Sequence, residues 1–272
     1  MGFEKEALEL FLTDDIEEAK KITERLNKYN SERQAIEKEI FEQAIKQIER
    51  EGNDKKAIIL GGNGWHHGVI GIVASKITEM YFKPSILVCF EDDLGKGSGR
   101  SIPGFDLHGA LANLSKYLIK YGGHEMAVGL GIKKKDFNRF KEAFEEYAEK
   151  QNVEDIVQVL EIDKQVTLKE VKIETIRELD SLEPFGEGNR RPIFVFKNLK
   201  IDSIRALSDG KHIKLTLKDG ATIVNAIGFN MGYLSEEYTL GDQIDVAGML
   251  EINEFNGTDY IQINIKDIMK SY

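Results

Sequence analysis

Three short glycine-rich segments carry the side chains that could bind an anion. The first runs from Gly61 to Gly68 and contains the pair His66-His67, directly before a predicted helix. Glycines let the backbone approach a ligand closely, and the first turn of a helix presents unpaired amides. The spacing fits neither a Walker loop nor a dinucleotide-binding fingerprint. We expect His66 to contact a phosphate or a base; the alternative is that it only caps the loop.

The second segment, Gly95 to Ser101, alternates glycines with polar and cationic residues. We interpret it as a loop after a strand. Its backbone amides, the hydroxyls of Ser98 and Ser101 and the guanidinium of Arg100 would surround a phosphate oxygen. The alternative is a flexible polar loop without a ligand.

The third segment places Gly122, Gly123 and His124 after a predicted helix. The glycine pair brings backbone amides close to a ligand, and histidine is partly charged near neutral pH. We expect these three residues to contact a phosphate, with a purely structural histidine as the alternative. The five histidines of the sequence lie outside any carboxylate cluster, so no metal site is predicted.

Apolar periodicity predicts the elements that position these segments. A helix is expected over residues 4–50, with Thr13 or Asp14 as its N-cap. Strands over 57–60 and 85–90 enclose a helix over 69–80, which indicates a parallel pair joined by a crossover and therefore an α/β domain. Two further helices are expected, one over 107–120 after Asp106 and one from Asp136, with an apolar face of Phe137, Phe140, Phe144 and Tyr147.

The sequence pattern of the remaining residues predicts a small β domain. A helix near residues 173–182 and a turn-rich stretch over 184–189 precede six apolar runs of strand length. These runs cover 193–196, 199–207, 212–217, 222–229, 243–252 and 260–268. Their number and spacing predict an antiparallel barrel such as an OB-fold. The expected domains are a linker helix over 1–52, the α/β domain over 53–151, and a helical connector with the barrel over 152–272.

Composition limits the possible functions. The single cysteine, Cys89, excludes an internal disulfide and a thiolate zinc cluster, and the absence of a long apolar run indicates a cytoplasmic protein without membrane contact. The net charge of −10 argues at first against a nucleic-acid partner. Cations nevertheless gather in the barrel at Arg190, Arg191, Lys197, Lys200, Arg205, Lys211, Lys214 and Lys218. This basic band could follow a nucleic-acid backbone, with Phe194, Phe196 and Phe229 as possible stacking platforms.

Taken together, the segments resemble the RecJ-type single-strand-specific exonucleases of the Asp-His-His phosphoesterase superfamily. The matching stretches are residues 64–74, residues 97–107, and Gly122-Gly123-His124 with Ala127 and Gly129. Residues 7–15 resemble the junction that enters the linker helix, and residues 182–189 resemble the lead into the OB domain. The resemblance implies a DHH-associated α/β domain between a long linker helix and an OB-fold barrel.

The resemblance also implies a function. In this family an upstream domain holds two divalent ions, Mn²⁺ or Mg²⁺, which activate water. This sequence has no Asp-His-His and no Asp-x-Asp, so we expect it to bind DNA but to be inactive alone and to need no cofactor of its own. Ser98 and Arg100 would contact the terminal phosphate, and Gly122, Gly123 and His124 the scissile phosphate. The parent would digest single-stranded DNA from 5′ to 3′ in repair and recombination, with a single-strand-binding protein or a helicase as possible partners.

Other functions stay open at this point. One is a small phosphoesterase of the same superfamily that acts on short oligonucleotides or cyclic dinucleotides, although such proteins normally lack a barrel. Another is a non-catalytic nucleic-acid-binding module or a protein-interaction clamp, which the acidic balance and the missing metal site would suit. A nucleotide-binding enzyme that uses residues 61–68 is disfavoured because the usual phosphate-loop signatures are absent.

Overall fold

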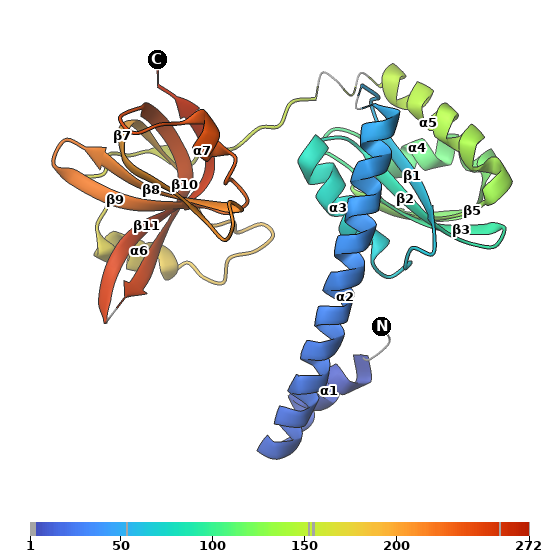
Figure 1. The fold of residues 1–272 in the computed structure, drawn as a ribbon, viewed down its shortest axis with the longest axis horizontal. Coiled ribbons are helices and arrows are strands. Elements are labelled where there is room, and N and C mark those ends of the chain that lie inside the picture. The colour runs from blue at the N-terminus through green and yellow to red at the C-terminus, as the bar shows by residue number, and fades with distance from the viewer. Residues whose placement is uncertain (1–3, 53, 152, 154–155, 256, 272) are drawn as a thin grey trace. The chain divides into compact units, whose positions relative to one another are not determined.

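The computed structural model describes residues 4–52, 54–151, 153, 156–255 and 257–271, and it divides into two compact units. Unit 1 comprises Met1–Gln158 and unit 2 comprises Val159–Tyr272. Figure 1 shows the elements of each unit, which are described separately below. No helix among the described residues is long and apolar enough to cross a membrane.

Unit 1 is built on a mixed five-stranded sheet with the order β1-β2-β3-β5-β4. Its strands are β1 (Ile58–Asn63), β2 (Ser85–Glu91), β3 (Leu94–Arg100), β4 (Leu118–His124) and β5 (Ala127–Lys133). β1 and β2 pair in parallel, with α3 (Ile70–Tyr81) between them in the chain, whereas the other neighbours are antiparallel. The predicted crossover and α/β class are therefore confirmed.

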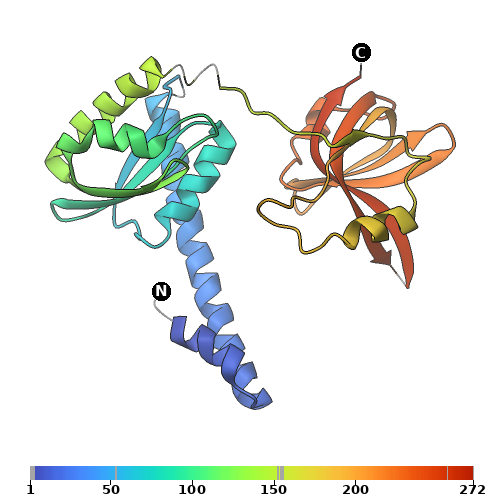
Figure 2. The same cartoon turned by 180° about the vertical axis from the view of Figure 1, so that it is seen from behind.

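Helices cover both sides of this sheet (Figure 1 and Figure 2). On one side, α2 (Ile16–Glu51) and α3 bury a core against alternate residues of β1 and β2, including Leu60 and Leu87. On the other side, α4 (Leu107–Asn113) and α5 (Phe137–Lys150) pack on the intervening residues, including Ile59 and Val88. Because side chains alternate along a strand, these two strands contribute to both cores.

The amino-terminal helix is interrupted, contrary to the expectation of one helix over 4–50. α1 (Glu4–Leu12) and α2 are separate, and neither Thr13 nor Asp14 is the cap. Asp15 caps α2 instead, because its Oδ1 accepts hydrogen bonds from the amides of Glu17 and Glu18 at 2.8 and 3.3 Å. The hydroxyl of Thr13 accepts from the amide of Asp15. Short polar side chains that bond the backbone in this way compete with a continuous helix.

Two further predictions in unit 1 are wrong. The segment over residues 95–100 lies in the central strand β3 and not in a loop. The helix after Asp106 ends at Asn113, and a short 3-10 turn (Ser115–Tyr117) leads into the edge strand β4. The Asp106 cap itself is confirmed, with Oδ1 2.8 Å from the amide of Gly109. Pairing of β4 with β5 overrides the local helical pattern of residues 114–120.

Unit 2 is a closed barrel. Its strands are β6 (Lys164–Gln165), β7 (Phe194–Leu207), β8 (His212–Asp219), β9 (Thr222–Gly228), β10 (Gln243–Phe255) and β11 (Thr258–Lys270). The sheet order is β10-β11-β9-β8-β7-β6, and a further β10–β7 pairing closes the barrel. The helices are α6 (Ile173–Asp180) and α7 (Leu234–Glu237). The five longer strands and their closure confirm the predicted OB-fold.

Two of the expected strands are joined into one. Residues 193–196 and 199–207 were expected as two strands, but β7 is a single strand that bends at Asn198. Asn198 has a φ of 56°, and the β7–β10 register shifts between Ile244 and Val246 beside it. Such an irregularity bends a strand without ending it, which lets β7 pair with both β8 and β10.

Candidate nucleic-acid interface

On the α2/α3 side of the unit 1 sheet, an exposed area over β5 and β4 lies beside α3, which packs against β3. Strand register places Ser98 opposite Gly129, and Gly129 opposite Gly122. In the next cross-strand row, Ala127 of β5 lies between Arg100 of β3 and His124 of β4. In the row on the other side, Gly131 lies between Lys96 and Lys120. We call this area the glycine face; it consists of Lys96, Ser98, Arg100, Lys120, Gly122, His124 and Gly129.

The glycines of β3 point away from this face into the core. A Cβ at Gly95 would lie 2.7 Å from Val88, and one at Gly97 would lie 2.8 Å from Leu130. The backbone groups of β3 pair with β2 and β5, so a phosphate nest built from its amides, as predicted, does not form. Only the side chains of this segment, among them Ser98 and Arg100, are presented to the glycine face.

Gly122 and Gly129 keep the face flat. No atom lies within 4 Å of a Cβ built on Gly122, and only Gly97 O, at 3.9 Å, approaches one on Gly129. Packing therefore does not require glycine at either position, whereas a ligand that lies against the backbone does. Gly123 serves the hairpin instead, since its φ is +136° and a Cβ would collide with the carbonyl oxygen of Ala127.

Arg100 supplies a positive charge whose position is held by the protein. Its Nη1 donates to Ser98 Oγ at 3.2 Å and to the carbonyl oxygen of Gly99 at 2.8 Å. Gly71 of α3 lies against it, since a Cβ there would be 3.2 Å from Arg100 Nη2. Among the described residues, no carboxylate forms an ion pair with Arg100. A half-buried guanidinium in this setting can bind a phosphate oxygen through a charge-assisted hydrogen bond.

His66 lies in the turn that leads into α3. Its Nδ1 accepts from the amide of Gly68 at 3.1 Å, and its ring stacks on His67 with 5.2 Å between centroids. The glycines of this loop serve packing: Gly62 lies against the ring of Trp65, and a Cβ on Gly61 would be 2.7 Å from Phe90. The contact of His66 with Gly68 is the loop cap named above as the alternative, although the other ring nitrogen is left for a ligand.

Ser101 does not belong to the surface. Its side chain is buried, and its Oγ donates to the carbonyl oxygen of Phe105 at 2.7 Å. The prediction that Ser101 contacts phosphate is therefore wrong. Its hydroxyl instead fixes the turn between β3 and α4.

In unit 2, the basic residues of β7 and β8 line up in cross-strand rows on the outside of the barrel. Lys200 lies opposite Lys218, and Arg205 lies opposite Lys214. Between them, Ser203 Oγ and Thr216 Oγ1 are 2.7 Å apart. Like charges directly opposite each other destabilise a sheet, so a bound anion would relieve the repulsion. We call Lys200, Ser203, Arg205, Lys214, Thr216 and Lys218 the barrel ladder.

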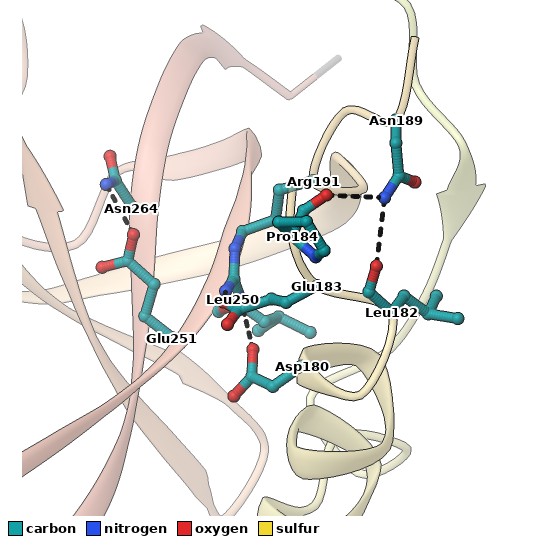
Figure 3. A network of polar contacts seen from close by, with 9 residues as sticks. All are labelled: Asp180, Leu182, Glu183, Pro184, Asn189, Arg191, Leu250, Glu251 and Asn264. Carbon is teal, nitrogen blue, oxygen red and sulfur yellow. Dashed lines mark hydrogen bonds and ion pairs between the residues drawn. The ribbon is translucent and has the colours of Figure 1, made fainter. Parts of the chain in front are cut away.

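Arg191 forms ion pairs within the protein (Figure 3). Its Nη1 lies 2.7 Å from Asp180 and its Nη2 lies 2.9 Å from Glu183, while its guanidinium stacks 4.6 Å from the ring of Phe185. In the same turn, Asn189 Nδ2 donates to the carbonyl oxygens of Leu182 and Pro184. Arg191 therefore holds the turn before β7, which corrects its prediction as a DNA contact.

Lys197 also forms an ion pair within the protein. Its Nζ pairs with Asp245 at 2.5 Å. Asp245 Oδ1 accepts from the amide of Asn198 at 2.9 Å and from Ser271 Oγ at 2.6 Å. Burial alone would raise the pKa of Asp245, but these hydrogen bonds outweigh it and hold the pKa below its ordinary value. The pair stabilises the bend of β7, which corrects the prediction for Lys197.

The other residues of unit 2 that were predicted to contact DNA differ in their exposure to solvent. Arg190 and Lys211 are exposed, and the only ion pair of Arg190 in the described chain is a 4.0 Å contact with Glu187. Among the aromatic candidates, Phe196 is fully buried and Phe194 packs against the core. Phe229 is 51% exposed and meets the ring of His212 edge-on. Phe229 is thus the candidate that could stack on a base.

Comparison with known proteins identifies both units. Residues 54–150 match the family model of the DHHA1 domain, and residues 162–267 match that of the RecJ OB domain. The single-stranded-DNA-specific exonuclease RecJ of Bacillus subtilis is 33% identical over 265 residues, which cover 96% of this chain and 34% of that protein. The two units thus match the DHHA1 domain and the OB domain of RecJ exonucleases.

Other RecJ proteins agree with this assignment. RecJ of Thermus thermophilus is 32% identical, over 99% of this chain and 38% of the relative. The crystal structure of the Thermus thermophilus RecJ in complex with Mg²⁺ superposes with a TM-score of 0.82 and 31% identity, covering 98% of this chain and 41% of that one. The resemblance in sequence is thereby confirmed. The chain spans about a third to a half of the length of the curated RecJ relatives.

The Thermus RecJ structures are described as complexes with Mg²⁺ and Mn²⁺. Within the part of this chain that the structure describes, no group of three or more His, Cys, Asp or Glu side chains could hold a metal ion. The residues present do not fit either ion, and we assign no hydrolytic step to them.

Sequence reasoning did not assign two cations of the glycine face. Lys96 and Lys120 flank Gly131 from β3 and β4, and both are exposed. The signal was available in the strict alternation of residues 95–100, which has the period of a strand and puts Lys96, Ser98 and Arg100 on one side.

Proposed function

We propose that this chain is the single-strand-binding region of a RecJ-type exonuclease that digests DNA from 5′ to 3′. The observation that carries the proposal is the glycine face, where Arg100 and Ser98 stand beside Gly129 and Gly122 without a carboxylate partner in the described chain. A flat backbone surface edged by cations suits a phosphodiester strand better than a small metabolite.

Individual roles follow from position. Arg100 and Ser98 bind the phosphate at the strand terminus, and Gly122 and His124 lie beside the scissile phosphate, whereas the expected phosphate contact of Gly123 is replaced by its role in the hairpin. His66 contributes from the start of α3. In unit 2, the barrel ladder, together with Arg190 and Lys211, holds the strand through its backbone, and Phe229 stacks on a base.

Cleavage itself belongs to a different part of RecJ. We propose that Mn²⁺ or Mg²⁺ is bound there, and that this chain holds the substrate without cutting it. The parent then acts in DNA repair and recombination in the cytoplasm, with single-stranded DNA as substrate and a single-strand-binding protein or a helicase as further partners.

Two alternatives predict different behaviour. A phosphoesterase of short oligonucleotides or cyclic dinucleotides is disfavoured by the OB barrel, which such proteins normally lack. A non-catalytic binding module is favoured by one observation, the absence of a metal-binding group among the described residues. It would bind DNA in the same way but would not support cleavage when combined with a RecJ metal-binding region.

The test is fluorescence anisotropy of the full chain with 5′-phosphorylated single-stranded and duplex DNA across a salt series, with and without Mn²⁺. We expect preference for the single strand, weakening with salt, and an intact oligonucleotide after incubation. Equal affinity for both forms, or no binding, would reject the proposal. Cleavage by the pure chain would reject the assignment of catalysis to another region of RecJ.

A further inference from the structure

The loop over residues 61–68 is attached to α2 by two glutamine side chains. Gln43 Oε1 accepts a hydrogen bond from Trp65 Nε1 at 2.7 Å, and Gln47 Nε2 donates to the carbonyl oxygen of Gly61 at 3.2 Å. Residues four positions apart lie on the same face of a helix, so both amides reach the loop from one side. The two bonds therefore fix the loop to α2 at its first residue and at its middle.

Trp65 is the buried anchor of this loop. Its side chain is 5% exposed and belongs to the core that α2 and α3 form on the sheet. A Cβ on Gly62 would lie 2.2 Å from Trp65 Cε2, so the ring lies against the loop backbone. A buried indole N–H requires an acceptor, which Gln43 supplies. The amide of Gln43 is itself oriented, because its Nε2 donates to Glu39 Oε1 at 3.1 Å.

The same loop carries His66 toward the glycine face. His66 follows Trp65 directly, and its carbonyl oxygen accepts from the amide of Ile70 at 3.2 Å, which joins it to the first turn of α3. The next residue, Gly71, contacts the glycine face, since a Cβ there would lie 3.0 Å from Ser98 Oγ. The Nδ1 of His66 accepts from an amide of the loop, so in the neutral ring Nε2 carries the proton and can donate it to an oxygen.

We propose that Gln43 is a positioning residue for DNA binding, which acts through Trp65 to hold His66 where its Nε2 reaches a phosphate oxygen of the strand. Apolar packing of the indole is non-directional, whereas the hydrogen bond from Gln43 fixes the ring along one direction. His66 is the neighbour of Trp65 in the chain, so a rotation of the indole moves His66 relative to the glycine face. The inference rests on the proposed DNA binding and adds the contribution of α2 to it.

The test is a double-mutant cycle on the full chain, with affinity for 5′-phosphorylated single-stranded DNA measured by fluorescence anisotropy. Gln43→Leu removes the acceptor of the indole and should weaken binding by roughly 3- to 30-fold. In the His66→Ala background the same substitution should change affinity by less than about twofold, because Gln43 acts through His66. The matched control is Gln34→Leu, the same change at an exposed position of α2, which should keep wild-type affinity.

A charge-neutral exchange should restore the bond. In the Glu39→Gln/Gln43→Glu variant, a carboxylate on the second position accepts from Trp65 Nε1, and an amide on the first position donates to that carboxylate, as the wild-type pair does with the roles reversed. Net charge is unchanged, so the exchange adds no general repulsion of DNA. Affinity within about twofold of wild type is expected. An exchange variant as weak as Gln43→Leu would overturn the inference.

Each result of the cycle decides a different claim. An equal loss of affinity in the wild-type and His66→Ala backgrounds would show a general effect on the fold and overturn the inference. Wild-type affinity in Gln43→Leu or in His66→Ala would also overturn it, while the proposed function would stand. A wild-type chain that does not bind single-stranded DNA would reject the proposed function and this inference together.

Discussion

Ser98 lies directly opposite Gly129 in the register of β3 and β5, on the side of the sheet that carries α3, where a Cβ on Gly71 would lie 3.0 Å from Ser98 Oγ. One residue away on β3, Gly97 faces the opposite side, where a Cβ would lie 2.8 Å from Leu130. Two glycines close in space therefore have different reasons to be glycine. Glycine at position 129 leaves room for a ligand, whereas glycine at position 97 leaves room for the core side chain of Leu130.

Substitution by valine should separate these two reasons. Gly129→Val places its side chain in open space, so we expect a change in the free energy of unfolding of under about 1 kcal/mol. The same side chain covers the glycine face and should weaken binding of single-stranded DNA at least tenfold, about 1.4 kcal/mol. Gly97→Val should instead destabilise unit 1 by about 1–3 kcal/mol through overpacking. Urea unfolding and anisotropy measure both effects, and wild-type affinity in Gly129→Val would contradict the site.

Arg100 should contribute directly to DNA affinity. Arg100→Ala removes a charge-assisted phosphate contact and is expected to weaken binding of 5′-phosphorylated single strands by about 1–3 kcal/mol. Arg139 is exposed on α5 and serves as the control, because Arg139→Ala removes the same charge from unit 1 without touching the glycine face. If the two variants bind DNA equally well, general charge and not the glycine face explains the affinity.

Arg190 and Arg191 are adjacent and should behave oppositely. Arg191→Ala leaves Asp180 and Glu183 without their partner and should lower the free energy of unfolding of unit 2 by about 1–3 kcal/mol. Arg190→Ala should change stability by less than about 0.5 kcal/mol, because its ion pair is exposed, but should weaken DNA binding. Thermal unfolding and anisotropy on both variants test this, and the reverse pattern would exchange the two roles.

The Asp245 network should appear in the pH dependence of stability. The pKa of Asp245 is lowered in the folded state, so its contribution is complete above the unfolded value of about 3.9 and is lost as the pH falls through the folded pKa. Asp245→Asn should cost about 1–3 kcal/mol at pH 7, and this difference should shrink below about pH 4. Urea unfolding followed by circular dichroism at several pH values measures it. A difference that stays constant into acid would show that Asp245 does not titrate as described.

The elements with strong apolar periodicity could be predicted from the sequence. The strand over 57–60, the helix after Val69 and the strand from Ser85 hold long apolar runs, and their order alone requires a parallel pair. In these cases local pattern and tertiary packing favour the same structure.

β3 could not be predicted from propensity because its residues are poor strand formers. Glycine, lysine and serine dominate residues 95–98, and only the neighbours β2 and β5 make this segment a strand. The roles of Ser101, Arg191 and Lys197 depend on partners at Phe105, Asp180 and Asp245, which pattern alone does not reveal. Residue types thus identified side chains that could bind a phosphate. Long-range packing then determined which of these side chains are exposed to a ligand and which are bonded within the protein.

The anchoring of α2 also has a mechanical consequence. Its second half is fixed to the sheet of unit 1, because Gln43 accepts a hydrogen bond from Trp65 Nε1 at 2.7 Å and buried Glu37 pairs with Lys76 of α3. Its first half, some 20 residues or about 30 Å, extends beyond this anchored region, and its contact is with α1. A tilt of about 5° at the anchored end therefore becomes a displacement of roughly 2–3 Å at Ile16. The helix can therefore act as a stiff lever, which enlarges small changes in the orientation of its anchored half.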